Sequence, residues 1–279
     1  MFDFDTELAK RYGAFASYQS GISPALTEYY GENPAIEMDR LLDLYANTES
    51  YVLDVGCGAG HTLCRLASKV KQIWGIDMNA DLLQAAQLRI EHLGLTNARV
   101  VSANVTEPAS LKPLPDATFD LAFSRRGPNL NEHFLRTLSK EAIIVQELVS
   151  NFDGYPLREI FGRRHYAPYF HTDQAVLLSN YAELELFPIS CKEYFYEEFF
   201  RDSEHLEAFL IQNGATLSNW RLPARPYEPL RDRPALDLYI RYNTTSKGIR
   251  VLRQRKIFVL RRAVVTYYPV DSASSSSPA

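Results

Sequence analysis

The sequence predicts an α/β fold in which a mainly parallel sheet carries helices on both faces. Between about residues 40 and 150, short apolar runs alternate with longer segments whose apolar residues recur at helical spacing. A glycine-rich turn follows the first of these runs, and an aspartate ends the second. Because a parallel pair of strands needs a crossover connection, this alternation is typical of strands joined by helices.

Five apolar runs have the length of buried strands, and they are residues 51–55, 72–76, 98–102, 119–124 and 142–148. The segments between them contain good helix formers, and we expect helices over 61–69, 80–93 and 134–138. Gly94 occupies the position after a helix at which glycine is favoured. We expect these elements to belong to one domain over residues 41–266.

The N-terminal segment and the tail have a different pattern. Residues 4–18 are helical and aromatic, and a second helix is expected from Pro34, since proline suits the first helical turn. We therefore expect residues 1–40 to form an N-terminal helical cap, whose tyrosines either cover a pocket or pack on the core. The serine-rich tail, residues 267–279, cannot bury apolar surface and is expected to be disordered.

After residue 150 the pattern becomes less regular, and we interpret this part as irregular insertions in the same domain. Helices are expected over 173–185 and 202–212, and strands over 190–200 and at the end of 248–261. Residues 221–235 contain four prolines and several arginines, which predicts an irregular loop.

The composition is that of an ordinary globular protein, with 46% hydrophobic and 23% charged residues. The formal net charge of −4 argues against a chain that mainly neutralises phosphates. Three cysteines without a CxxC pair make a disulfide framework or a metal site unexpected. No apolar run reaches the ~18 residues that cross a bilayer, and acids stand where a secretory signal would be basic. We therefore expect a cytoplasmic protein with no membrane segment.

The most informative segment is the turn after the first strand, in which Asp54 precedes Gly56, Gly58 and Gly60. Glycines at this spacing let the backbone turn tightly and approach a ligand closely. Asp77 ends the next strand, where a carboxylate can reach ribose hydroxyls. A dinucleotide would place its pyrophosphate at such a turn, and Asp54 would repel it. The carboxylate instead favours a cationic amino-acid group, and hence S-adenosylmethionine; a purely structural glycine turn is the alternative.

Residues 50–150 resemble the class I S-adenosylmethionine-dependent methyltransferases, in particular the ubiquinone/menaquinone-biosynthesis and small-molecule group. The resemblance is carried by the Asp-x-Gly-x-Gly-x-Gly turn, by the aspartate after the second strand, and by Leu114-Pro115-Asp116 followed by Phe119-Asp120. It implies a Rossmann-like sheet of seven strands, with the last strand antiparallel, and S-adenosylmethionine as cofactor.

The resemblance also implies which residues bind the cofactor. These residues are Asp54, Gly56, Gly58, Gly60, Asp77, Met78, Asn104 and Val105. Asp77 would hold the ribose, and Met78 would lie beside the adenine. Asn104 stands where the family usually has an acidic residue, and its carbonyl oxygen can accept a hydrogen bond from the adenine amine.

The residues after the fourth strand usually face the acceptor in this family. Arg125 could bind an anionic acceptor there, because a guanidinium matches a carboxylate or a phosphate; the alternative is that it pairs with surface acids. Glu147, at the end of the fifth strand, is a candidate base or acceptor ligand. His165 is the histidine best placed to accept a proton, and it belongs to the basic and aromatic segment 161–171. That segment is a lid, an RNA-contacting patch or a solvated loop.

Three functions fit these observations. The first is in-line methyl transfer from S-adenosylmethionine to a small-molecule acceptor, with an anionic acceptor as one option. The second is methylation of a ribosomal-RNA base, and the third is non-catalytic binding of the cofactor. The sequence has neither an Asn/Asp-Pro-Pro-aromatic motif for a nucleobase amine nor a Pro-Cys motif for pyrimidine C5 chemistry. We therefore place small-molecule methyl transfer first.

Overall fold

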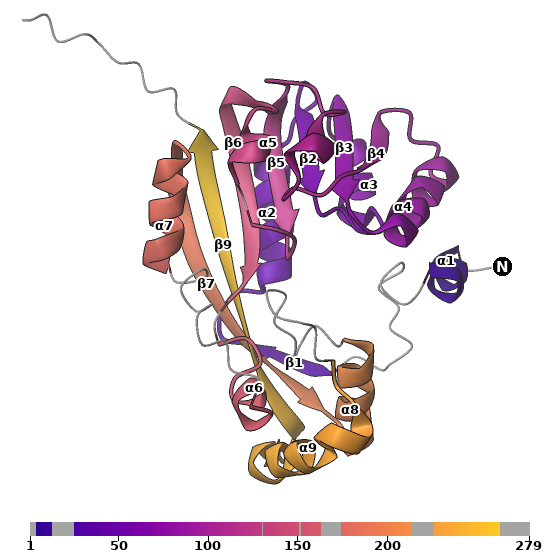
Figure 1. Cartoon of the computed structure of the whole chain (residues 1–279), viewed down its shortest axis with the longest axis vertical. Helices are drawn as coiled ribbons and strands as arrows, with labels where there is room; N and C mark the ends of the chain where they lie inside the picture. Colours follow the sequence, from indigo (N-terminus) through magenta and orange to yellow (C-terminus); the bar gives the residue numbers. More distant parts are fainter. Residues whose placement is uncertain are drawn as a thin grey trace, which may run out of the picture.

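The computed structural model describes residues 4–12, 25–129, 131–150, 152–162, 174–213 and 226–262. Within these ranges one sheet of nine strands runs through the molecule (Figure 1). Eight strands follow the order β1-β7-β9-β6-β5-β2-β3-β4, and β8 pairs with β9 outside this order. The strands are β1 Leu26–Tyr29, β2 Tyr51–Val55, β3 Gln72–Asp77, β4 Ala98–Ser102, β5 Phe119–Arg125, β6 Leu138–Val149, β7 Leu186–Phe200, β8 Thr244–Thr245 and β9 Gly248–Arg262.

The strands β4, β3, β2, β5 and β6 pair in parallel. Side chains such as Val52 and Leu53 are buried on opposite faces, which explains why these strands read as continuous apolar runs. The helices α2 Pro34–Tyr45, α3 His61–Ala67 and α4 Ala80–His92 supply the core on one face. The helices η2 Pro108–Leu111, α5 Glu132–Leu135 and α7 Gln174–Glu183 supply the core on the other. The predicted parallel sheet with helices on both faces is confirmed.

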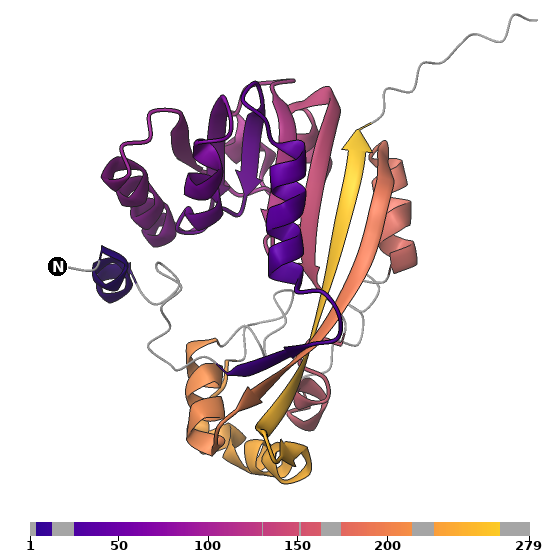
Figure 2. The ribbon, with the colours of Figure 1, turned by 180° about the vertical axis from the view of Figure 1, so that it is seen from behind.

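The sheet continues beyond its parallel half through two long strands. β9 pairs antiparallel with β6 on one side and with β7 on the other. Both β7 and β9 have 15 residues and extend past β6 as a ribbon, the part at the bottom of Figures 1 and 2, with β1 on the edge of β7 and β8 on the edge of β9. Helices α6 Leu157–Ile160, α8 Ser203–Gln212 and α9 Pro229–Asn243 pack a separate core on the far end of this ribbon. In the described ranges, every helix is too short or too polar to span a bilayer.

The predicted sheet has seven strands, whereas the observed sheet has nine. The seven strands of the resemblance correspond to β4, β3, β2, β5, β6, β9 and β7, and β9, the last in the described chain, is antiparallel as expected. β1 adds to the outer edge of β7, and β8 forms a tight turn with β9. Both additional strands are short and partly exposed, so their sequences lack the apolar runs that indicate buried strands.

Part of the expected N-terminal helical cap is a strand. Helix α1 Phe4–Tyr12 is helical as predicted and packs against α4, but residues 26–29 form β1. The first residue of α2 is Pro34, as predicted, with Asn33 as its N-cap. The tail, residues 267–279, lies outside the described residues. The strand β1 went unpredicted because its partner β7 follows more than 150 residues later in the chain.

The loop expected over 221–235 is wrong from Pro229 onward, whereas residues 226–228 have no regular structure, as expected. Residues from Pro229 onward belong to α9, and Pro229 occupies its first turn, where the missing N–H has no intrahelical partner anyway. Pro234 lies inside the helix, where proline is normally unfavourable. Leu236 and Tyr239 of the same helix are fully buried, and this packing outweighs the cost of the interior proline.

Candidate functional site

The glycine turn joins β2 to α3 and is anchored to the end of β3. The backbone N–H groups of Gly56 and Cys57 donate to the carbonyl oxygen of Ile76, at 2.8 and 2.9 Å. Gly56 has a φ of +79°, and a Cβ there would lie 2.9 Å from Cδ of Pro128. A side chain at this position would therefore meet backbone strain and a steric clash together. The turn is fixed between β3 and the loop that follows β5.

Gly58, in contrast to Gly56, has open space beside its backbone. Its φ is +52°, yet a Cβ built on it would have no heavy atom within 4 Å. Its N–H donates to Oδ2 of Asp77 at 2.9 Å, and Oδ1 of Asp77 accepts from the N–H of Asn79 at 2.9 Å. The structure thus brings together the turn and the aspartate that the sequence singled out. Because each carboxylate oxygen can accept another hydrogen bond, Asp77 can still receive ribose hydroxyls.

Asp54 directly precedes the turn and is 3% exposed. No hydrogen bond joins its carboxylate to another described residue. Burial, reinforced by the nearby Asp77, raises the pKa of Asp54 well above its usual value, and Arg125 opposes the shift. An ammonium group beside this carboxylate would stabilise its ionised form. The residues present therefore fit S-adenosylmethionine, whose amino-acid end carries an ammonium.

The residues expected near the adenine follow β3 and β4. Met78 is exposed, whereas Val105 is buried in the core. Asn104 is engaged within its own loop: Oδ1 accepts from the N–H and the hydroxyl of Thr106, at 3.1 and 2.8 Å. Its Nδ2 donates to Oε1 of Glu107 at 2.9 Å. The amide of Asn104 therefore stabilises the loop after β4, and its hydrogen bond to the adenine stays a prediction.

Helix α1 lies against the glycine turn, a contact that the sequence analysis missed. Leu8 of α1 is buried against Ala59 of the turn. Arg89 of α4 connects the two, since its Nε donates to the carbonyl oxygen of Ala59 at 3.1 Å and its Nη2 to Oδ1 of Asp5 at 2.7 Å. The hydroxyl of Tyr12, at the end of α1, is buried without a hydrogen-bond partner. The aromatic character of the N-terminal segment was the only signal for a role near the cofactor.

Arg125 and Glu147 lie opposite each other at the carboxyl ends of β5 and β6. Nε of Arg125 is 3.6 Å from Oε2 of Glu147, and its Nη1 donates to Oδ1 of Asp39 at 3.0 Å. Its Nη2 donates to the carbonyl oxygen of Ala35 at 3.3 Å. The guanidinium is thus surrounded by acceptors from α2 and β6. This arrangement favours the alternative in which Arg125 pairs with acids of the protein.

Three further residues, His165, Cys191 and Asp120, lie away from this group or outside the described residues. His165 lies outside the described residues, so its role stays a prediction. Cys191 lies on β7 beside the core, and burial raises the pKa of its thiol, which suits an unreactive strand cysteine. The carboxylate of Asp120 accepts from the backbone N–H of Tyr51 at 3.2 Å, as expected for a structural residue.

Neighbouring strands bring charged side chains to the same end of the sheet. In spatial order from β3 to β9, these residues are Asp77, Asp54, Arg125, Glu147 and Arg255. The first four stand close to the carboxyl ends of parallel strands, and Arg255 lies opposite Val149, the last residue of β6. Open α/β sheets bind their ligands at this end. This row of charges is therefore the candidate active site.

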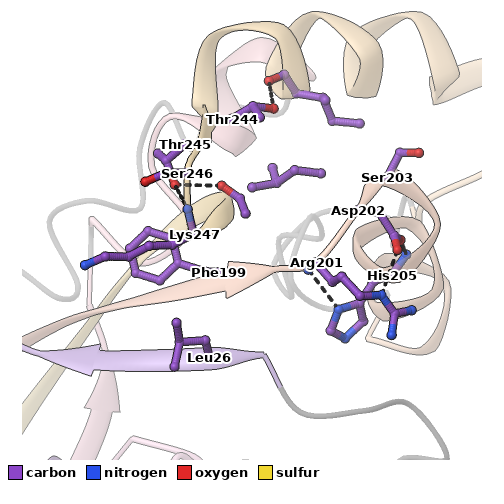
Figure 3. Close-up of a pocket in the computed structure, with 13 residues that line it drawn as sticks. Leu26, Phe199, Arg201, Asp202, Ser203, His205, Thr244, Thr245, Ser246 and Lys247 are labelled. Carbon is purple, nitrogen blue, oxygen red and sulfur yellow. Dashed lines mark hydrogen bonds and ion pairs between the residues drawn. The ribbon is translucent and has the colours of Figure 1, made fainter.

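A cavity of about 650 Å³ lies at the far end of the ribbon (Figure 3). It is lined by residues of β1, β7, α8 and α9 and by the turn between β8 and β9. Nε of Arg201 donates to Oδ2 of Asp202 at 2.8 Å, and Nζ of Lys247 lies 2.7 Å from Oε2 of Glu28. Both of these basic side chains in its described lining are neutralised by an acid. The cavity is therefore a weaker candidate than the row of charges at the glycine turn.

Comparisons with known proteins indicate a methyltransferase domain. A family model described as a methyltransferase domain matches residues 47–153. A protein-L-isoaspartate O-methyltransferase from Saccharophagus degradans is 31% identical over 93 residues, 33% of this chain and 40% of that protein. A 23S rRNA (uracil-C5)-methyltransferase from Aliivibrio fischeri is 42% identical over 69 residues, 25% of this chain and 15% of that protein. The chain thus spans less than half the length of these relatives.

Solved structures share the fold over a larger part of the chain. A provisionally assigned methyltransferase from Bacillus halodurans superposes with a TM-score of 0.56 at 16% identity, covering 82% of this chain and 100% of that chain. The segment matched by the family model contains the glycine turn, Asp77, Arg125 and Glu147, and it ends before β7. Residues 47–153 are therefore similar to a methyltransferase domain, and most of the chain shares the fold of this solved structure.

Proposed function

We propose that this chain transfers the methyl group of S-adenosylmethionine to a small polar molecule. The observation that carries the proposal is the contact between Asp77 and Gly58, because it joins a ribose-binding carboxylate to an open stretch of backbone. The buried carboxylate of Asp54 supports it, since a buried charge without a partner is costly unless a ligand compensates it.

The bound cofactor would supply a methyl group on a sulfonium, which is a good leaving group. Asp77 would accept hydrogen bonds from the ribose, and Asp54 would stabilise the ammonium. Gly58 leaves room for the ligand because it has no side chain. Alignment and exclusion of water then contribute much of the rate enhancement. Glu147, buried and beside Arg125, is the residue placed to hold the acceptor or take its proton.

A second candidate is methylation of an RNA base. It is favoured by the likeness to the rRNA methyltransferase, although that likeness covers only 69 residues. The basic and aromatic segment that suggested RNA, residues 161–171, lies mostly outside the described residues. Binding of a ribosomal-RNA fragment that weakens steeply between about 50 and 200 mM salt would favour this candidate. The net charge of −4 favours the small-molecule acceptor instead.

The test of the proposal has two steps. Calorimetric titration with S-adenosylhomocysteine should show binding to the native chain, and NAD should not compete with it. Incubation with methyl-labelled S-adenosylmethionine and a fractionated metabolite extract should then move label into a small-molecule fraction. Absence of binding would overturn the assignment of the site. Binding without any transfer to metabolites or RNA would support the third hypothesis, a non-catalytic cofactor-binding protein.

A further inference from the structure

A layer of buried polar side chains separates two apolar cores on one face of the ribbon. Val259 of β9 belongs to the core beneath α2 and α3, and Val251 belongs to the core made with α8 and α9. Because side chains alternate along a strand, Arg253 and Arg255 point to the same face as these valines and lie between them. We call this group the polar layer, and its members are Glu147, Asp153, Tyr196, Glu198, Arg253 and Arg255.

The charged members of the polar layer contact one another in succession. Nη1 of Arg255 donates to Oδ1 of Asp153 at 2.5 Å, and its Nε lies 3.7 Å from Oε1 of Glu147. Nε of Arg253 lies 3.2 Å from the same oxygen of Asp153 and 3.6 Å from Oε2 of Glu198. Although burial raises the pKa of Asp153, the guanidinium groups of Arg253, Arg255 and Arg158 outweigh it and the pKa is lowered. Asp153 is therefore ionised at neutral pH.

Several atoms of this layer are buried without a hydrogen bond. They are Oε2 of Glu147, Oε2 of Glu198, and Nε and Nη1 of Arg253. The side chain of Glu147 is only 4% exposed and that of Arg253 only 11%. Each buried polar atom without a hydrogen bond destabilises the folded chain unless a ligand satisfies it. The atoms without a hydrogen bond include carboxylate acceptors and guanidinium donors. A ligand that satisfied all of them would therefore need both donor and acceptor groups.

The polar layer lies directly beside the row of charges at the carboxyl ends of the parallel strands. Glu147 belongs to both groups, because it contacts Arg125 of β5 on one side and Arg255 of β9 on the other. From there the layer continues away from Asp77 toward the ribbon, along β9. A molecule bound on this layer would therefore lie next to the cofactor, on the side that the glycine turn does not occupy.

The charges of the layer are close to balance. The guanidinium groups of Arg253 and Arg255 within the layer, and those of Arg125 and Arg158 beside it, face its three carboxylates. An anion on Arg253 would also meet Asp153, and a cation on Glu147 would also meet Arg255. A ligand of one charge would thus be repelled by part of the layer, whereas a ligand with separate positive and negative groups would be attracted at both ends.

Resting on the proposed function, we propose that the polar layer is the acceptor site and that the acceptor is a small zwitterion with an amine and a carboxylate. Its carboxylate binds the guanidinium of Arg253, and its amine donates to Oε2 of Glu147, which lacks a hydrogen bond. This ligand class differs from the anionic acceptor that Arg125 suggested in the sequence. The guanidinium of Arg125 already donates to Asp39 and to the carbonyl oxygen of Ala35, whereas Nε and Nη1 of Arg253 have no hydrogen-bond acceptor.

The experiment is a calorimetric titration of the native chain saturated with S-adenosylhomocysteine. The probes are α-, β- and γ-amino acids, each in its free form, as the N-acetyl derivative and as the amide. We expect at least one free amino acid to bind, and both derivatives of that amino acid to bind at least tenfold more weakly. Equal binding of the N-acetyl derivative, or no binding of any free amino acid, would overturn the proposal.

Two variants assign the two ends of the ligand. Arg253→Gln should abolish the preference for the free acid over the amide, and Glu147→Gln should abolish the preference for the free amine over the N-acetyl form. A residue with only a structural role would weaken all three forms equally. The matched controls are Arg233→Gln and Glu49→Gln, both at exposed ion pairs far from the layer in sequence, and these should leave all preferences unchanged.

Binding of S-adenosylhomocysteine separates this inference from the proposed function. If the nucleoside binds and no zwitterion does, the acceptor assignment fails while the cofactor site stands. If the nucleoside does not bind, the proposed function fails first. Should either variant fail to fold, the comparison of free, N-acetyl and amide forms on the native chain still decides the outcome.

Discussion

Buried charges are compensated in one way near the glycine turn and in another way along the ribbon formed by β7 and β9. Around the turn, the charged groups are few, and Asp54 is buried without a hydrogen bond from the described residues. Along the ribbon, Asp153 is equally buried but is contacted by two guanidinium groups. The first arrangement is compensated only by a ligand, whereas the second is compensated within the protein. We therefore expect loss of the Asp54 carboxylate to weaken ligand binding and loss of the Asp153 carboxylate to destabilise the fold.

The largest effect is expected for Asp153→Ala. Removing this carboxylate leaves Arg253 and Arg255 close together without their shared partner, and breaking a buried ion pair costs about 3–5 kcal/mol. Chemical denaturation should show this loss in the free energy of unfolding. The control Lys247→Ala breaks an exposed pair with Glu28 and should cost at most about 1 kcal/mol. Similar losses for both variants would remove the distinction between the ribbon and the surface.

The two glycines of the turn should respond differently to alanine. Gly56→Ala combines a positive φ with a contact of 2.9 Å to Pro128, and we expect it to destabilise the fold by about 3 kcal/mol. Gly58→Ala meets no protein atom, so its cost should be about 1–2 kcal/mol of backbone strain. Its affinity for S-adenosylhomocysteine should nevertheless fall about tenfold or more. An unchanged affinity in Gly58→Ala would show that the open space is not where the ligand binds.

Asp77→Ala should weaken binding of S-adenosylhomocysteine about 100-fold, which corresponds to about 2.7 kcal/mol. The variant loses the charged acceptor for the ribose and also the hydrogen bond that orders Gly58. Calorimetry on this variant is compared with Asp237→Asn, an exposed residue of α9 that pairs with Arg233. Native affinity in Asp77→Ala would contradict the assigned role of this carboxylate.

The smallest expected effect is a gain in stability, in contrast to the losses predicted for the variants above. Because the pKa of Asp54 is raised in the folded protein, its contribution to stability is full below the unfolded pKa of about 4 and is lost as pH rises through the folded value. Asp54→Asn cannot ionise, and without ligand it should be more stable than the native chain at neutral pH by about 1–2 kcal/mol. Thermal unfolding across a pH series measures this difference.

The same carboxyl predicts proton release on cofactor binding. The ammonium of the ligand favours the ionised form of Asp54, so binding should release a proton and become tighter as pH rises. Calorimetry in buffers of different ionisation enthalpy detects that proton. The proton should be absent in Asp54→Asn, whose affinity should also be lower. Equal proton release in both proteins would place the titrating group elsewhere.

The sequence determined the parallel half of the sheet and the meeting of the glycine turn with Asp77. In this half each strand is buried on both faces and each helix follows its strand directly, so local apolar runs such as 72–76 carry the necessary information. The turn and Asp77 are separated by less than 25 residues, and one strand–helix–strand unit places them together.

The tertiary structure alone decided the rest. The polar layer draws on Glu147, Asp153, Glu198 and Arg253, which come from three strands and a loop spread over more than 100 residues. No local period marks such a group, since each residue taken alone reads as an ordinary surface charge. The same holds for Arg125, whose partner Asp39 lies 86 residues earlier, and for α1, which reaches the turn through Arg89. Local spacing specifies backbone turns and strand order, but only long-range pairing across the sheet determines which charges become buried together.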